Sequence, residues 1–315
     1  MNEKINAIKT EIAKVMVGQE TLIDALLIGL ITDGHILVEG VPGLAKTTAI
    51  NSLAKALGLD FKRVQFTPDL LPSDIVGTEM YDQRSGEFRV KKGPAFTHLL
   101  LADEINRAPA KVQSALLEVM QEHQITIGEK SFRLDDPFLV LATQNPVEQE
   151  GTYRLPEAQL DRFMLKVLVD YNTFDEEMLI VDRIANRTFG TIEQVAGAQD
   201  ILAMRDEVLD VHVDEAVTRY MMKIVFATRN PAEYGVGDIA EYLEYGASPR
   251  ASINLYKAAK ASAYLRGNDF VTPLDVADTV KGVLRHRMVL NYRAEAAGVT
   301  PDDLIGTIMQ TVKLP

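Results

Sequence analysis

The chain of 315 residues contains no cysteine, which excludes disulfide bonds, thiolate metal sites and a cysteine nucleophile. Positive charge is also in deficit, with 33 Lys and Arg against 45 Asp and Glu and a net charge of −12. Nucleic-acid motors more often carry a basic face, so this balance disfavours nucleic acid as a partner. The five histidines are scattered without metal-ligand spacing, and we interpret each as structural: His35, His98, His123, His212 and His286.

A long hydrophobic run is absent as well. The most apolar window, residues 22–31, is too short to span a bilayer and contains Asp24, so we expect a buried helix and no membrane segment. Residues 1–4 are polar and no signal-peptide pattern follows them, and the missing cysteines suit a reducing compartment. These features favour a cytoplasmic protein. The chain of 315 residues is long enough for two domains, and its 47% hydrophobic and 25% charged residues are typical of a globular protein.

The clearest chemical signal is an octapeptide that separates a predicted strand from a predicted helix. Residues 36–39 are strand formers, and from residue 48 to 57 apolar side chains recur at helical spacing before Gly58. A glycine loop in this context brings backbone amides onto a phosphate, and the helix N-terminus adds its partial positive charge. The loop residues are Gly40, Val41, Pro42, Gly43, Leu44, Ala45, Lys46 and Thr47.

Two side chains of this loop have specific chemical roles. Lys46 can reach the terminal phosphates of a nucleotide, and the Thr47 hydroxyl can ligate Mg²⁺. The strict motif has glycine where this chain has Ala45, and we expect that position to open the helix, where alanine is favourable. The alternative is an ordinary strand-to-helix turn with a surface lysine.

A second apolar run, residues 98–104, ends in two carboxylates. A continuous apolar run predicts a strand buried on both faces, and ligands bind at the carboxyl ends of such strands. Asp103 can hold Mg²⁺ directly or through water, and Glu104 can orient or deprotonate an attacking water. The alternative is a solvated acidic turn, which the phosphate-binding loop upstream makes a weaker interpretation.

A third strand end carries an amide. Further strands are predicted at residues 61–66, 138–143 and 163–169. Two hairpins are predicted at residues 80–90 and 125–132. Beyond residue 143, Asn145 can hydrogen-bond both a phosphate oxygen and a water; the alternative is a turn asparagine before proline. Residues 67–74 contain two prolines and are expected to form a loop.

The C-terminal part reads differently, because no strand is predicted there. Thr173 begins a capping box and a helix that runs to about Arg187, and residues 188–199 resemble a linker. Later helices begin where a capping residue precedes the apolar pattern or a first-turn proline, at Asp214, Ser248-Pro249, Thr272-Pro273 and Thr300-Pro301. The sequence therefore predicts a small all-helical domain.

Taken in order, five motifs resemble those of AAA+ ATPases, specifically the MoxR family, and the resemblance covers nearly the whole chain. The substitution at Ala45 is typical of that family. The motifs are Gly40–Thr47, Leu101–Ala108, Ala142–Pro146, Leu155–Phe163 and Gly246–Ala251.

The resemblance implies an α/β fold, a P-loop NTPase with a parallel sheet flanked by helices and followed by a small all-α lid. The strand that ends near Asn145 would lie between the two Walker strands. The expected limits are a nucleotide-binding core over 1–172, a helix and linker over 173–199 and the lid over 200–315. The core would carry hairpin insertions at about 75–92 and 123–134, which resemble the helix-2 and pre-sensor insertions of one AAA+ branch.

The resemblance also implies roles for individual residues. Lys46 and Thr47 would be the Walker A pair, with Thr48 following them in the ATP site, and Asp103 and Glu104 the Walker B pair. Thr47 and Asp103 would hold Mg²⁺. Val17-Gly18-Gln19 is a plain inter-helix turn by its residues alone, but the family makes it an adenine contact.

Three assignments complete the implied machinery. Asn145 would be the first sensor, Arg250 the second sensor and Arg162 the arginine finger. Arg250 follows Ser248-Pro249 and is expected in the first turn of a helix, whereas Arg162 precedes a strand at the sheet edge. The alternative for Arg162 is a surface ion pair with Asp161, Glu157 or Glu148. Arg154 and Arg107 are rival candidates for the arginine finger.

The function that follows is ATP hydrolysis with Mg²⁺ by a ring-forming chaperone-like ATPase. The family implies a homo-hexamer, a partner with a von Willebrand factor A domain, and remodelling or maturation of client proteins, in some cases by metal insertion. One rival function is a nucleic-acid motor or loader on the same fold. Another is a nucleotide-dependent scaffold with little turnover, against which Glu104 argues because a pure binder needs no carboxylate at the water position.

Overall fold

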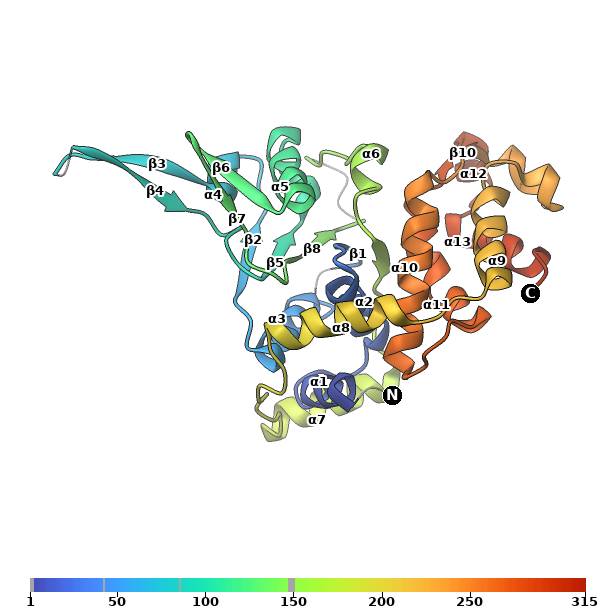
Figure 1. The fold of residues 1–315 in the computed structure, drawn as a ribbon, viewed down its shortest axis with the longest axis horizontal. Helices are drawn as coiled ribbons and strands as arrows, with labels where there is room; N and C mark the ends of the chain where they lie inside the picture. Colours follow the sequence, from blue (N-terminus) through green and yellow to red (C-terminus); the bar gives the residue numbers. More distant parts are fainter. Residues whose placement is uncertain (1–2, 42, 85, 147–150) are drawn as a thin grey trace. The chain divides into compact units, whose positions relative to one another are not determined.

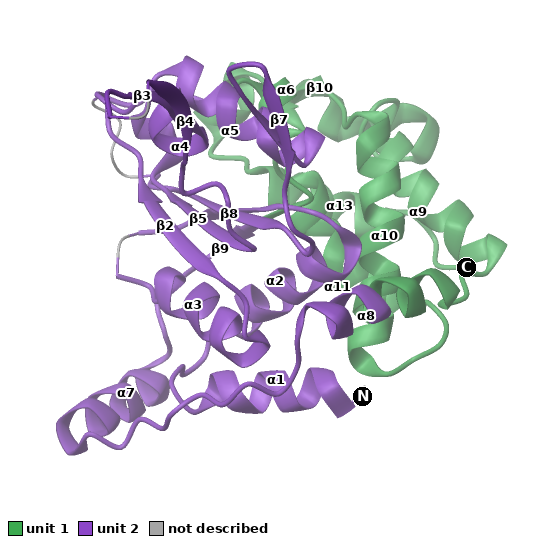
Figure 2. Ribbon diagram, turned by 60° about the vertical axis from the view of Figure 1, so that its left-hand side comes forward, with its two compact units in different colours: residues 1–2, 156–166, 204–315 green, residues 3–155, 167–203 purple. Residues whose placement is uncertain are grey.

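The computed structural model describes residues 3–41, 43–84, 86–146 and 151–315, which form two compact units (Figures 1 and 2). We call residues 3–155 with 167–203 the α/β unit, and residues 156–166 with 204–315 the helical unit. No helix of the described residues has the length and apolar character that a membrane span requires. The domain limits at residues 172 and 199 remain a sequence prediction.

The α/β unit is built on a five-stranded sheet of order β2-β5-β8-β1-β9. The described pairings, β2 with β5, β5 with β8 and β8 with β1, are parallel, so these strands end at the same edge. The sequence prediction that β8 lies between β5 and β1 is confirmed. The bounds are β1 (Ile36–Glu39), β2 (Phe61–Gln65), β5 (Leu99–Asp103), β8 (Leu139–Gln144) and β9 (Leu165–Leu168).

Helices cover both faces of this sheet. In Figures 1 and 2, α5 lies on the side of the sheet opposite to α2 and α3. The apolar window around Asp24 is a buried helix as predicted, and Gly58 ends the helix after the phosphate loop in a left-handed conformation. The bounds are α1 (Glu3–Ala13), α2 (Glu20–Thr32), α3 (Lys46–Leu57) and α5 (Ala110–Glu122).

Both predicted hairpins are present as two-stranded antiparallel sheets. They are β3 (Gly77–Asp82) with β4 (Glu87–Lys92), and β6 (Gln124–Ile127) with β7 (Lys130–Arg133). The loop expected over residues 67–74 is only partly correct, because α4 (Pro72–Val76) begins inside it. Its signal is proline in the first turn and Asp74, whose carboxylate accepts a 2.8 Å hydrogen bond from the amide of Leu71.

Two short helices lie between strands of the sheet, and the predicted capping box follows its last strand. Ile105–Arg107 forms the 3₁₀ helix η1, and α6 spans Glu157–Leu160. Thr173 caps α7 (Phe174–Asn186) as predicted. Its hydroxyl accepts a hydrogen bond from the backbone amide of Glu176, and the Glu176 carboxylate accepts one from the backbone amide of Thr173. After the linker comes α8 (Ala198–Asp210).

The helical unit confirms the predicted helix starts, with Ser248, Thr272 and Thr300 each preceding a first-turn proline. The expectation of no strands is wrong, because β10 (Leu243–Tyr245) pairs antiparallel with β11 (Val289–Leu290). Strands this short contain too little alternation to be detected. The helices are α9 (Glu215–Ala227), η2 (Pro231–Tyr234), η3 (Gly237–Glu241), α10 (Pro249–Arg266), α11 (Pro273–Leu284), α12 (Tyr292–Ala297) and α13 (Pro301–Thr311).

A buried ion pair joins residues 156–166 to the rest of the helical unit. The Arg287 side chain is fully buried, and its Nε donates to Asp161 Oδ1 at 2.8 Å while Nη2 donates to the Phe163 carbonyl at 2.6 Å. Burial lowers the pKa of Arg287 to about 10, although Asp161 opposes that shift. The guanidinium therefore stays charged at neutral pH, and removing either partner would leave an uncompensated buried charge.

The cap of α9 gives a test of the fold. Asp214 Oδ1 accepts a 2.7 Å hydrogen bond from the Ala216 amide. Asp214→Ala should lower the free energy of unfolding by about 1 kcal/mol, because that amide loses its partner. Asp214→Asn keeps the acceptor and should retain most of the stability. Urea denaturation of the three proteins measures the difference, and equal losses in both variants would contradict a capping role.

Candidate active site

A cavity of about 350 Å³ lies at the carboxyl-terminal edge of the sheet. It is lined by the predicted phosphate loop, by the ends of β2, β5 and β8 and by the first turn of α3. Lys46, Asp103, Glu104 and Asn145, which are distant in sequence, all contribute to this lining. The parallel strands bring these polar residues together because their carboxyl ends meet at one edge.

The phosphate loop owes its path to two glycines. A Cβ on Gly40 would lie 2.6 Å from the carbonyl oxygen of Val169, so only glycine fits beside the chain that follows β9. Gly43 has φ +90°, which a side chain would strain. Pro42 lies outside the described residues.

Ala45 corrects a sequence expectation. It does not open the helix in a helical conformation but precedes it as the N-cap, with φ 54° in the left-handed region. Glycine adopts this conformation without strain, which explains the strict motif, and alanine is the smallest substitute. No side chain caps α3, so the amides of its first turn are available to an anion.

Lys46 supplies the positive charge of the cavity. Its Nζ donates a 2.7 Å hydrogen bond to the carbonyl of Gly40, which holds the ammonium beside the loop. Burial lowers its pKa, and the negative charges of Asp103 and Glu104 partly restore it. An anionic ligand here would relieve the desolvation cost that the ammonium carries.

Thr143 fixes both carboxylate residues of β5. Its hydroxyl donates to Asp103 Oδ1 at 2.6 Å and accepts from the backbone amide of Glu104 at 2.9 Å. Glu104 has φ 56°, a left-handed conformation that costs free energy in a non-glycine residue. The hydrogen bond from its amide therefore helps to hold the Glu104 side chain toward the cavity.

Three further side chains contact these carboxylates. Arg63 donates to Asp103 Oδ2 from Nη2 at 2.6 Å and from Nε at 3.0 Å. Gln65 Nε2 donates to Glu104 Oε2 at 2.9 Å, and Arg107 Nε lies 2.9 Å from the same oxygen. Sequence reasoning did not assign roles to Arg63, Gln65 and Thr143. The signal in the sequence that could have pointed to Arg63 and Gln65 was the alternation of polar residues along β2. In the structure β2 pairs with β5, and Gln65 lies opposite Asp103.

Asn145 lies where the sequence predicts, buried at the end of β8 and in the cavity lining. The turn at residues 17–19 is not part of that lining. Its Val17 carbonyl accepts from Asn172 Nδ2 at 3.0 Å, and Gln19 Nε2 donates to the Asp170 carbonyl at 2.9 Å. The adenine contact predicted there remains a prediction.

The two remaining predicted arginines belong to the helical unit. Arg250 lies in the first turn of α10 as expected, and its Nη1 is 3.7 Å from Asp161 Oδ2. Ser248 Oγ also donates to this carboxylate, at 2.9 Å. Arg162 is exposed and lies between α6 and β9, a strand at the edge of the sheet. Glu148, one of its alternative ion-pair partners, lies outside the described residues.

Comparisons with known proteins decide the family. The model of the ATPase family associated with various cellular activities (AAA) matches residues 35–165, and that of the AAA lid domain matches residues 238–308. The chain is 47% identical to Chaperone MoxR1 of Mycobacterium tuberculosis, over 97% of this chain and 81% of that protein. It is 32% identical to Protein MoxR of Paracoccus denitrificans, over 96% and 93% respectively. The chain belongs to the MoxR family of AAA ATPases.

A solved structure agrees with this assignment. A candidate ATPase from Cytophaga hutchinsonii is 52% identical and superimposes with a TM-score of 0.93, covering 99% of this chain and 95% of that one. YeaC of Bacillus subtilis is 42% identical over 96% of this chain and 92% of its own. This MoxR-family chain is therefore an ATPase with an AAA nucleotide-binding fold followed by a helical lid domain.

Thr143 offers a test of the site. Thr143→Val keeps the shape of the side chain but removes the hydroxyl between Asp103 and the Glu104 amide, so ATP turnover should fall about 10–100-fold. Thr143→Ser retains the hydroxyl and should stay within a few fold of wild type. Steady-state phosphate release measures both, and equal activity of the valine variant and wild type would exclude this positioning role.

Proposed function

We propose that this ATPase hydrolyses ATP together with Mg²⁺ and works as an oligomer that remodels client proteins. The observation that carries the catalytic part is the cavity in which Lys46 faces Asp103 and Glu104, with Thr143 bonded to both carboxylate residues. A protein that only bound the nucleotide would need the phosphate loop and Lys46 but not Glu104. The second carboxylate, held in a strained backbone conformation, supports turnover.

The residues of the cavity fit a magnesium nucleotide. The uncapped N-terminus of α3 and the desolvated ammonium of Lys46 suit phosphate oxygens, and the volume of about 350 Å³ is typical of a ligand pocket. Thr47 and Asp103 supply the hydroxyl and carboxylate oxygens that Mg²⁺ prefers. The ion would neutralise charge on the phosphates, and these two residues would hold it.

The remaining site residues act on the attacking water. The Glu104 carboxylate accepts its proton, and the buried Asn145 amide orients it or a phosphate oxygen. Arg250, which lies beside Asp161 at the start of α10, is the lid residue that senses the nucleotide. We assign the finger that completes a neighbouring site to Arg162, with Arg154 and Arg107 as rivals. Arg107 is the weaker rival because it pairs with Glu104 of its own chain.

An exposed helix supports assembly. None of the residues of α7 is buried, and its apolar side chains include Phe174, Val181 and Ile184, which are 78%, 63% and 62% exposed. An amphipathic helix with an uncovered apolar face favours a protein partner. The chaperone name of the Mycobacterium relative supports clients of this kind. Family membership suggests that the oligomer is a hexamer, that a partner protein carries a von Willebrand factor A domain, and that the remodelling includes metal insertion into clients.

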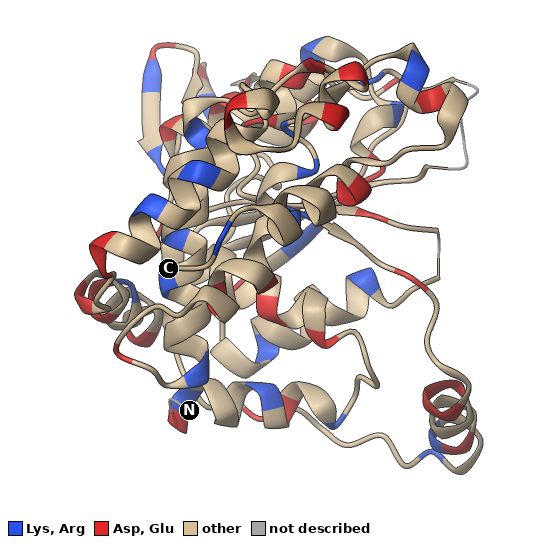
Figure 3. Ribbon diagram, turned by 90° about the vertical axis from the view of Figure 1, so that its right-hand side faces the viewer, with Lys and Arg blue, Asp and Glu red and all other residues tan. Residues whose placement is uncertain are grey.

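The charge distribution supports a protein client over a nucleic acid. Figure 3 shows Lys and Arg interspersed with Asp and Glu along the ribbon. The net charge of −12 points the same way. ATP turnover stimulated by DNA or RNA in a salt-dependent manner would contradict this part of the proposal.

The two key residues of the cavity predict different defects. Lys46→Ala should abolish ATP binding because it removes the ammonium of the loop, whereas Glu104→Gln should bind ATP and turn over at least about 100-fold more slowly because an amide accepts no proton. Isothermal titration with ATP and phosphate release would be measured for both. Equal loss of binding in the two variants would refute the division of roles.

The finger assignment needs two subunits to be tested. Arg162→Ala should assemble and bind ATP but hydrolyse poorly, since it lends no finger to its neighbour; a finger is worth about 10³–10⁵ in rate. Glu104→Gln still lends Arg162. When the two variants are mixed, competent interfaces should restore part of the wild-type turnover. No recovery, with subunit exchange verified by a fluorescent label, would rule out Arg162, and Arg154→Ala and Arg107→Ala would then be mixed in the same way.

A further inference from the structure

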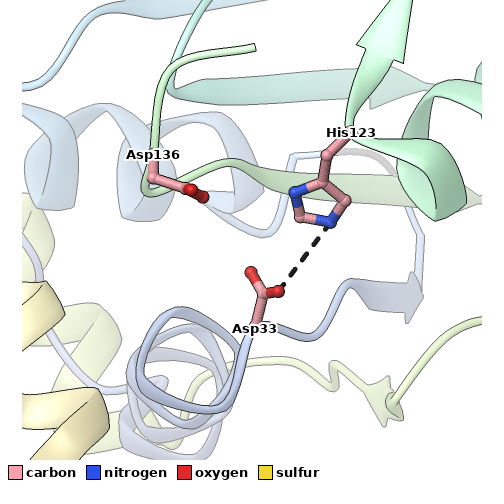
Figure 4. A group of neighbouring side chains, drawn as sticks. All are labelled: Asp33, His123 and Asp136. Carbon is pink, nitrogen blue, oxygen red and sulfur yellow. Dashed lines mark ion pairs between the residues drawn. The ribbon is translucent and has the colours of Figure 1, made fainter. Parts of the chain in front are cut away.

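Three side chains that sequence analysis left unconnected meet at the amino-terminal edge of the sheet. Asp33 lies three residues before β1 begins at Ile36, and Asp136 lies three residues before β8 begins at Leu139. Because β1 and β8 are parallel neighbours, both segments approach the same edge of the sheet, where a ligand oxygen of Asp33 lies within 4.8 Å of one of Asp136. His123, at the end of α5, completes the group (Figure 4).

The geometry suits a shared ion. Figure 4 shows the three side chains pointing toward one another from three separate segments. One ligand atom of each lies within 4.8 Å of the other two, and His123 Nε2 is 3.9 Å from Asp33 Oδ2. Metal–ligand bonds of about 2.0–2.2 Å place tetrahedral ligand atoms about 3.4 Å apart. Small side-chain rotations would therefore close the group around an ion.

A buried histidine holds the supporting segments in place. His35, two residues after Asp33, accepts a 3.1 Å hydrogen bond from the Val140 amide at Nδ1, and its Nε2 is 2.9 Å from the Met120 carbonyl. It thereby joins the start of β1 to β8 and to the last turn of α5. The Leu134 amide also donates to the His123 carbonyl, at 2.9 Å. The scaffold of the group is thus preorganised.

Backbone electrostatics at this position favour a cation. Asp33 and His123 are the C-caps of α2 and α5, so the negative ends of two helix dipoles converge on the group. Neither helix has a basic residue in its last turn. A divalent ion bound here would interact favourably with both helix C-termini.

We propose that Asp33, His123 and Asp136 form a binding site for a divalent transition-metal ion of the Zn²⁺ type. An imidazole nitrogen with two carboxylates suits Zn²⁺, Mn²⁺ or Co²⁺, whereas Mg²⁺ and Ca²⁺ prefer oxygen ligands alone. Three protein ligands leave a position for water or for a ligand from another molecule. The site lies at the opposite edge of the sheet from the cavity that contains Asp103, so it is distinct from the Mg²⁺ of the ATPase.

Metal binding tests the site directly. Tag-free protein stripped with EDTA should bind one Zn²⁺ per chain in isothermal titration. Asparagine tolerates the left-handed conformation of Asp33 and His123 and preserves the shape of aspartate, so Asp33→Asn, His123→Asn and Asp136→Asn are matched variants. Each should weaken Zn²⁺ binding by at least about tenfold, since even outer partners of metal ligands cost about 10–100-fold. The controls Asp135→Asn and His212→Asn should bind like wild type.

X-ray absorption at the zinc edge of the wild-type protein gives a reading that does not depend on any variant folding. It should show one imidazole with oxygen ligands. ATP turnover of His123→Asn with Mg²⁺ should match that of wild type. No zinc binding by wild type, unchanged binding in all three variants, or full displacement of Zn²⁺ by equimolar Mg²⁺ would each overturn the proposal.

Discussion

Burial of β5 and β8 on both faces is the constraint on which the rest of the α/β unit depends. Their side chains from Leu99 to Ala102 and from Leu139 to Thr143 are almost completely inaccessible, so charged groups must lie where the strands begin or end. Thr143 is the one polar side chain in these two runs, and it is satisfied by Asp103 and the Glu104 amide. The nucleotide site therefore lies where β5 and β8 end, and the proposed metal site lies where β1 and β8 begin.

Within the nucleotide site, every charge has an opposite charge nearby. Asp103 is bonded to Arg63 and Glu104 is paired with Arg107; burial lowers the pKa of the half-buried Lys46, and both carboxylates oppose that shift. Such an arrangement limits the cost of holding charges out of water before a ligand arrives. A nucleotide changes this balance, because its phosphates offer Lys46 a stronger partner than the Gly40 carbonyl to which it is bonded here.

The sequence predicted the elements that are long or bounded by distinctive residues. The buried strands, both hairpins, the capping box at Thr173 and the helix starts with proline were all recognisable. Lys46, Asp103, Glu104 and Asn145, which the sequence singled out, line one cavity, while their individual roles remain predictions. Prediction failed where tertiary contacts decide. The left-handed conformation of Ala45 and the short paired strands β10 and β11 have no recognisable pattern in the local sequence. The proximity of His123 to Asp33 and Asp136 depends on the order of the strands in the sheet, which the local sequence does not encode.

In the helical unit, the Asp161 carboxylate lies close to the two arginines for which we propose roles, Arg250 and Arg162. Asp161 accepts from Ser248, lies 3.7 Å from Arg250 at the start of α10, and is bonded to the buried Arg287; the next residue is Arg162. Arg287 cannot release Asp161 without leaving a buried charge unpaired, whereas Arg250 is half exposed and can leave at small cost. Asp161 is therefore a fixed point about which Arg250 can exchange partners. An exchange of this kind would alter the charge balance at Asp161, the residue next to Arg162 in the chain, so the residue proposed to read the nucleotide lies beside the segment that carries the residue proposed to serve a neighbour.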